Sequence, residues 1–124
     1  MLIADKRYES QIEVNKSKFI AVLTPISDVE DFKNILKQLQ KEHRKASHIV
    51  YAYRLDQTYK SNDDGEPKGT AGRPLLELLL KKDINNSALF VVRYFGGSKL
   101  GAGRLLRTYV QAGVAAISLL ESEN

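Results

Sequence analysis

The sequence contains no cysteine and no tryptophan among its 124 residues. The absence of cysteine excludes disulfide bonds, thiolate nucleophiles and cysteine-based zinc sites. Residues 1–20 are interrupted by charges and contain no apolar core of a secretory signal. Apolar runs such as the one within residues 87–92 are far too short to span a bilayer. We therefore expect a cytoplasmic protein that makes no membrane contact.

Acidic residues are also absent, but only from one part of the chain. Residues 84–120 contain no Asp or Glu, although the chain as a whole carries 15 acids and a formal net charge of +4. Every charged residue in this span is basic: Arg93, Lys99, Arg104 and Arg107. A local excess of positive charge favours polyanionic partners. The pattern gains weight because it coincides with most of the glycines.

The length and the 43% apolar content predict one domain with a single core, spanning residues 1–124. Hydrophobic periodicity separates strands from helices along the chain. It predicts strands at residues 8–14, 17–24, 47–55 and 88–94, helices at 28–42 and 75–80, a last helix through 106–120, and a long polar loop at 56–70. This order predicts an α+β fold with a two-layer mixed sheet and helices on one face.

The strongest local signal is the glycine-rich segment at residues 93–104, between a buried strand and a helix. Glycines let backbone amides approach a ligand, and a helix start adds unpaired amides that favour an anion. The spacing matches neither a phosphate-binding P-loop nor a dinucleotide fingerprint. The alternative is that the glycines only permit a tight turn and close packing. We assign anion or nucleic-acid contacts to Lys68, Arg73, Arg93, Tyr94, Phe95, Gly96, Gly97, Lys99, Gly101, Gly103, Arg104 and Arg107.

Aromatic side chains offer a second means of gripping unpaired nucleic acid, because bases stack on their rings. Aromatics within predicted strands, such as Tyr51 and Tyr53, more often belong to the core. We expect Tyr94 and Phe95 to be exposed, because both enter the glycine-rich segment.

The acidic segment at residues 63–73 allows several interpretations. Asp63, Asp64 and Glu66 could hold a hard cation such as Mg²⁺. Asp-Gly is also common in turns, and these acids could instead order the loop through ion pairs. His48 is expected to be a hydrogen-bonded structural residue, because no second histidine stands at a zinc-binding spacing. We assign no catalytic residue, no metal site and no cofactor, with Mg²⁺ as the alternative.

Two long motifs resemble one known family. SNDDGEPKGTAGRPLLELL and VVRYFGGSKLGAGRLLRTYVQA, with KSKFIA and ASHIVYAYRL upstream, are similar to the Impact N-terminal (YigZ-like) family. The resemblance implies a fold like the second domain of ribosomal protein S5. Matching the family's motifs position by position selects His48, Asp63, Asp64, Gly65, Glu66, Thr70, Gly72, Arg93, Tyr94, Gly96, Gly97, Lys99, Gly101, Arg107 and Tyr109.

The chain departs from the family pattern at two positions and in its extent. Lys68 stands where a small residue is usual, and Arg104 where glycine is usual; both add positive charge. The ferredoxin-like second domain that bacterial relatives commonly carry is expected to be absent.

The resemblance and the charge pattern together predict a non-catalytic module associated with RNA or the ribosome, with a translation-related regulatory role. One alternative is a protein–protein interaction module of a translational stress-response regulator, with a protein of translation control as partner. Another is a Mg²⁺-dependent enzyme acting on a phosphorylated small molecule, with Asp64 or Glu66 as base or metal ligand.

Overall fold

The computed structural model describes residues 1–124 and has a five-stranded sheet at its centre. Every neighbouring pair of strands in this sheet is antiparallel. The central strand is buried along nearly all of its length, which explains why its sequence is apolar on both faces. The strands lie in the order β2 (Tyr8–Val14), β3 (Ser17–Pro25), β7 (Ser87–Tyr94), β4 (His48–Leu55) and β5 (Thr58–Asn62).

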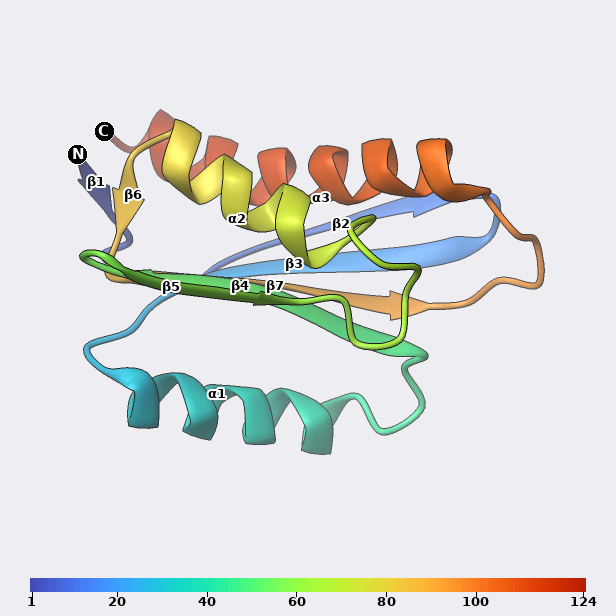
Figure 1. Ribbon diagram of the computed structural model, residues 1–124, viewed down its shortest axis with the longest axis horizontal. Coiled ribbons are helices and arrows are strands. Elements are labelled where there is room, and N and C mark those ends of the chain that lie inside the picture. The colour runs from blue at the N-terminus through green and yellow to red at the C-terminus, as the bar shows by residue number, and fades with distance from the viewer.

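Helices cover both faces of the sheet (Figure 1). Helix α1 (Val29–Glu42) lies alone on one face, and α2 (Gly72–Lys81) and α3 (Ala102–Ser122) lie together on the other. Alternate residues of β7 serve the two sides, as the period of a strand requires. Phe90 packs in a buried cluster with Phe32 of α1, whereas Val91 belongs to the larger cluster that contains Tyr109 of α3.

The predicted α+β class is confirmed, and two details of the prediction are wrong. The main sheet is antiparallel throughout rather than mixed; parallel pairing occurs between β1 (Leu2–Ile3) and β6 (Ile84–Asn85), which form a separate two-stranded sheet. The helices do not share one face, because α1 covers the side opposite α2 and α3. A strand that is apolar on both faces needs cover on both, so residues 88–94 already carried this information.

The polar segment at residues 56–70 is not one long loop. β4 turns back at Asp56 and Gln57 into β5, an exposed strand at one edge of the sheet. The remaining loop, residues 63–71, leads into α2, and residues 95–101 connect β7 to α3. Both chain termini lie at the other end of the molecule from residues 95–101 (Figure 1).

None of the three helices combines the length and apolar character needed to cross a membrane.

Candidate nucleic-acid interface

The acidic loop, residues 63–72, is held by its own carboxylates. Asp63 accepts hydrogen bonds from the amides of Gly69 (2.9 Å), Ala71 (3.2 Å) and Gly72 (2.8 Å). Asp64 accepts from the amide of Ile49 at the start of β4, at 2.7 Å. These acids are therefore acceptors for the protein's own backbone. Together with Glu66 and His48 they form no cluster that could hold a metal ion.

Glu66 is the third acid of this loop and is buried, with 8% of its surface exposed. Nη1 of Arg93 donates to both of its carboxylate oxygens, at 3.1 and 2.8 Å, and the hydroxyl of Tyr109 donates at 2.5 Å. Burial and this hydrogen bond raise the pKa of Tyr109 above its ordinary value, so the hydroxyl remains a donor. The acid thus ties the loop to β7 and α3 at once.

His48 completes this group, which we call the Glu66 cluster: His48, Glu66, Arg93 and Tyr109. Nδ1 of His48 lies 2.7 Å from the carbonyl oxygen of Asp64, which can only accept, so Nδ1 carries a proton. Nε2 faces Oε1 of Glu66 at 3.3 Å, a contact that is attractive when Nε2 is protonated as well. The bond from Nδ1 to the backbone of Asp64 joins His48 to the acidic loop, as expected of a structural histidine.

Arg93 was expected to contact an anion, and the structure places it inside. It is 5% exposed, pairs with Glu66, and its guanidinium carbon lies 5.3 Å from the ring centre of Phe19 and 5.6 Å from that of Phe95. Its Nε is buried without a hydrogen-bond partner. Because the pairing to Glu66 balances its charge, Arg93 contributes to the site by supporting Phe95 and not as a free surface cation.

A hollow of about 360 Å³ opens above the Glu66 cluster. The acidic loop, the end of β7 and the start of α3 meet here, so residues far apart in the sequence share one wall. It is lined by His48, Glu66, Pro67, Arg93, Phe95, Lys99, Leu100, Gly101, Ala102 and Leu105.

The glycine loop, residues 96–104, presents its backbone to solvent at this hollow. The amides of residues 97–104 have no hydrogen-bond acceptor within the protein, and most of these residues are exposed. Helix α3 begins here with no side-chain cap and no acid in its first turn. Gly97 and Gly101 adopt φ of 93° and 78°, which side-chain-bearing residues rarely do. The start of α3 therefore offers unpaired amides and the positive end of a 21-residue helix.

Of the basic residues that were predicted to contact an anion, some lie beside these amides and others do not. Lys99 lines the hollow, and Arg104 and Arg107 lie exposed on the first turns of α3 without an ion pair. Arg107 folds back along the helix, since its Nη1 lies 3.5 Å from the position of a Cβ on Gly103. Lys68 is exposed but does not line the hollow, and Arg73 pairs with Glu77 on α2 at 3.3 Å.

The two aromatics of the segment also differ. Tyr94 is half-buried, and its hydroxyl lies 2.6 Å from Nδ1 of His43 at the end of α1. Phe95 is 49% exposed and lines the hollow above the Glu66 cluster. Of the two aromatics that were expected to be exposed, the structure leaves Phe95 accessible and uses Tyr94 mainly to join α1 to the sheet.

A second hollow of about 420 Å³, on the other side of Phe95, was not anticipated from the sequence. The β2–β3 hairpin supplies most of its wall, because Lys18 pairs in register with Tyr94. No pattern in the sequence links this hairpin to the glycine loop, since the link depends on which strands are neighbours. This second hollow is lined by Gln11, Lys16, Lys18, Ile20, Tyr94 and Phe95.

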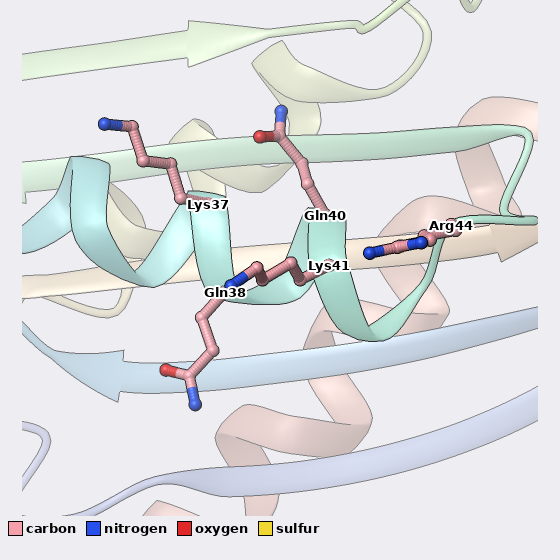
Figure 2. A pocket seen from close by; sticks show the side chains of 5 residues that line it. All are labelled: Lys37, Gln38, Gln40, Lys41 and Arg44. Atoms are coloured by element: carbon pink, nitrogen blue, oxygen red, sulfur yellow. The ribbon is translucent and has the colours of Figure 1, made fainter.

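A third concavity, on α1, is a different kind of surface. It is lined entirely by polar side chains of one helix and the residues that follow it: Lys37, Gln38, Gln40, Lys41 and Arg44. Figure 2 shows that Lys37, Gln38 and Gln40 point in different directions and do not converge. Without a converging set of groups or an aromatic wall, this face is interpreted as a solvated helix surface.

Comparison with known proteins matches this arrangement to one family. The model of the Impact N-terminal domain matches residues 15–117. The IMPACT family member YvyE of Bacillus subtilis (strain 168) is 41% identical over 119 residues, covering 91% of this chain and 55% of the relative. A structure described as that of a hypothetical protein aligns with a TM-score of 0.92 and 33% identity, over 95% of this chain and 60% of the other.

The structure of the two-domain translational regulator Yih1 aligns with a TM-score of 0.57 and 27% identity. This alignment covers 91% of the present chain and 48% of the regulator. The chain spans 55% of the length of the B. subtilis relative as well, so it corresponds to about half of these longer proteins.

Proposed function

This chain belongs to the Impact N-terminal domain family, and on that premise we propose that it is a non-catalytic, RNA- or ribosome-associated module with a translation-related regulatory role. The family assignment confirms the resemblance carried by the two long sequence motifs. The regulatory part of the proposal rests on the solved relative Yih1, which is described as a translational regulator. The RNA part rests on the chain's own surface.

The unpaired amides of residues 97–104 are the observation that carries the proposal. A phosphate oxygen accepts hydrogen bonds from such amides, and the start of a helix favours its negative charge. Lys99, Arg104 and Arg107 surround the same loop without ion-pair partners, so their charges are available to the same strand. A polyanion therefore fits this surface better than a neutral or cationic partner.

The buried groups beside the hollow support a binding role over a catalytic one. Glu66 accepts from Arg93 and Tyr109, and Nδ1 of His48 donates to the carbonyl oxygen of Asp64. A general base needs a free lone pair within reach of the proton that it removes. The carboxylate of Glu66 is instead occupied in holding the acidic loop against β7 and α3.

The test is a titration of the whole chain against short RNA at two salt concentrations. Three phosphate contacts, by Lys99, Arg104 and Arg107, contribute about −2 to the log–log salt slope, so through these contacts alone a fourfold rise in salt weakens binding on the order of 20-fold. A variant with these three residues changed to Gln should bind more weakly and with a slope shallower by about 2. The matched control changes Lys33, Lys37 and Lys41 of α1 to Gln and should keep the wild-type slope.

Two results would overturn the proposal. The first is absence of RNA binding by the wild-type chain at low salt, which would leave the protein–protein interaction module as the better interpretation. The second is an equal loss of slope in the α1 control, because binding would then follow total charge and not this surface.

A further inference from the structure

Phe95 separates two hollows and lines both of them. One hollow contains Lys99 and the start of α3, and the other contains Lys16 and Lys18 of the β2–β3 hairpin. The ring is 49% exposed and is therefore accessible to a ligand. An exposed aromatic with positive charge on both sides is the combination that grips unpaired nucleic acid.

The backbone on either side of this ring is fixed. The amide of Phe95 donates to the hydroxyl of Ser47 at 3.1 Å, and the amide of Gly96 donates to that of Ser17 at 3.0 Å. A Cβ on Gly96 would lie 2.1 Å from the backbone of Lys16, so the hairpin turn rests directly on the loop. The backbone that carries the ring is thus positioned before any ligand arrives, which reduces the entropy lost on binding.

The lysines on the hairpin side form no ion pair within the protein. Lys16 and Lys18 are exposed, and neither has an acidic partner within ion-pair distance. Glu13 lies opposite Lys18 in the strand register, but no salt bridge joins them. Gln11 adds an amide that can donate to a phosphate or a base. Both hollows therefore favour a negatively charged group beside the same ring.

We propose that this surface takes an unpaired stretch of nucleic acid, with one base stacked on Phe95 and the phosphates on either side of it lying in the two hollows. The inference rests on the proposed RNA-binding function and adds Gln11, Lys16 and Lys18 to its site. A duplex is excluded from this mode because its base faces are already stacked on one another and cannot reach the ring.

The stacking step is tested with a short oligouridine that carries one 2-aminopurine, whose fluorescence falls when the base stacks on an aromatic ring. The wild-type chain should bind this strand and quench the probe, and it should bind an RNA duplex of equal length far more weakly. Phe95→Ala should weaken binding about 5- to 150-fold, abolish the quenching and leave the salt slope unchanged. Phe95→Tyr should retain both affinity and quenching.

The second hollow is tested by charge removal. Lys16→Gln together with Lys18→Gln should make the salt slope shallower by about 1.4, which is the value for two lost contacts on a single strand. The matched control is Lys33→Gln together with Lys37→Gln, which removes the same charge from exposed positions of α1 that line neither hollow. The control should keep the wild-type slope and affinity.

The outcomes separate this inference from the function on which it rests. If the wild-type chain binds RNA with a steep slope but Phe95→Ala and the hairpin variant match it, or if duplex binds equally well, the inference is overturned and the proposed function stands. If no RNA binds, both are overturned. If oligoglutamate binds as tightly as RNA and is unaffected by Phe95→Ala, the surface recognises acidic protein and the inference is wrong.

Discussion

Helices α2 and α3 both begin in a glycine-containing loop, but the protein supplies a hydrogen-bond acceptor for the first amides of α2 only. The amides of Ala71 and Gly72 at the start of α2 are bound by the carboxylate of Asp63, which comes from the chain itself. The amides at the start of α3 have no such acceptor, and its first turn contains no acid. The two loops lie side by side around one hollow, so the contrast occurs within a single site.

This contrast shows what a glycine-rich loop before a helix can and cannot indicate. Every helix start requires acceptors for its first amides, and these come from side chains, water or a ligand. Where the protein supplies an acid, as Asp63 does, the loop is structural. Where it supplies none and surrounds the loop with cations, the acceptor must come from outside. Substitutions in the acidic loop should therefore change mainly the stability of the protein, and substitutions in the glycine loop mainly its affinity for RNA.

The largest effect on stability is expected at Glu66 of the acidic loop. Glu66→Ala leaves Arg93 buried with an unbalanced charge, and breaking a buried pair in this way lowers the free energy of unfolding by about 3–5 kcal/mol. Thermal unfolding followed by circular dichroism should show a fall of roughly 10–20 °C. The control is Glu77→Ala, which breaks the exposed pair with Arg73 and should change stability by less than about 0.5 kcal/mol. A loss below 1 kcal/mol at Glu66 would mean that the cluster does not hold the loop.

A smaller loss of stability is expected for substitution of Asp63, because it removes hydrogen bonds but leaves no buried charge unpaired. Asp63→Ala removes the acceptor of three backbone amides, two of them on buried residues, and should lower the free energy of unfolding by about 2–3 kcal/mol. Asp63→Asn keeps one acceptor oxygen and should recover part of this loss. Urea unfolding measures both. Equal stability of the Ala and Asn variants would show that the amides do not need this acceptor.

The order and type of most elements could be predicted from the sequence, because each depends on local periodicity. The strand pattern at β7 and the helical pattern of α1 are strong over their whole length. β5 was missed because it is a short, exposed edge strand whose residues lack apolar alternation. The two-sided cover of the sheet was indicated by β7, which is apolar on both faces, but the strand order depends on contacts between distant segments, which no local pattern specifies.

For the candidate site, the sequence indicated the glycine loop but only some of the residues that line the two hollows beside it. The glycine loop stood out because its glycines coincide with a span without acids, and its amides are exposed in the structure. Arg93 was misassigned because a charge at the end of an apolar strand has the same appearance in sequence whether it faces solvent or a buried partner. Its partner Glu66 lies 27 positions away. Lys16 and Lys18 were missed because they reach the site only through the pairing of β3 with β7.

The smallest effects on stability are expected from replacing one glycine by alanine in each loop, and the two effects should differ in sign. A Cβ on Gly72 would lie 2.7 Å from the backbone of Asn62, so Gly72→Ala should lower the free energy of unfolding by about 1–3 kcal/mol. A Cβ on Gly103 would meet only the end of the Arg107 side chain, at 3.5 Å. Because alanine favours the helix, Gly103→Ala should raise the free energy of unfolding by about 0.4–1 kcal/mol.

RNA affinity is the second property to measure, after stability, for the two glycine variants. Gly103→Ala keeps every backbone amide, so affinity should stay within about twofold of wild type while the protein becomes more stable. The outcome that contradicts the comparison is destabilisation by both substitutions. It would mean that the start of α3 is packed as tightly as the start of α2, and its amides could then no longer be regarded as open to a phosphate.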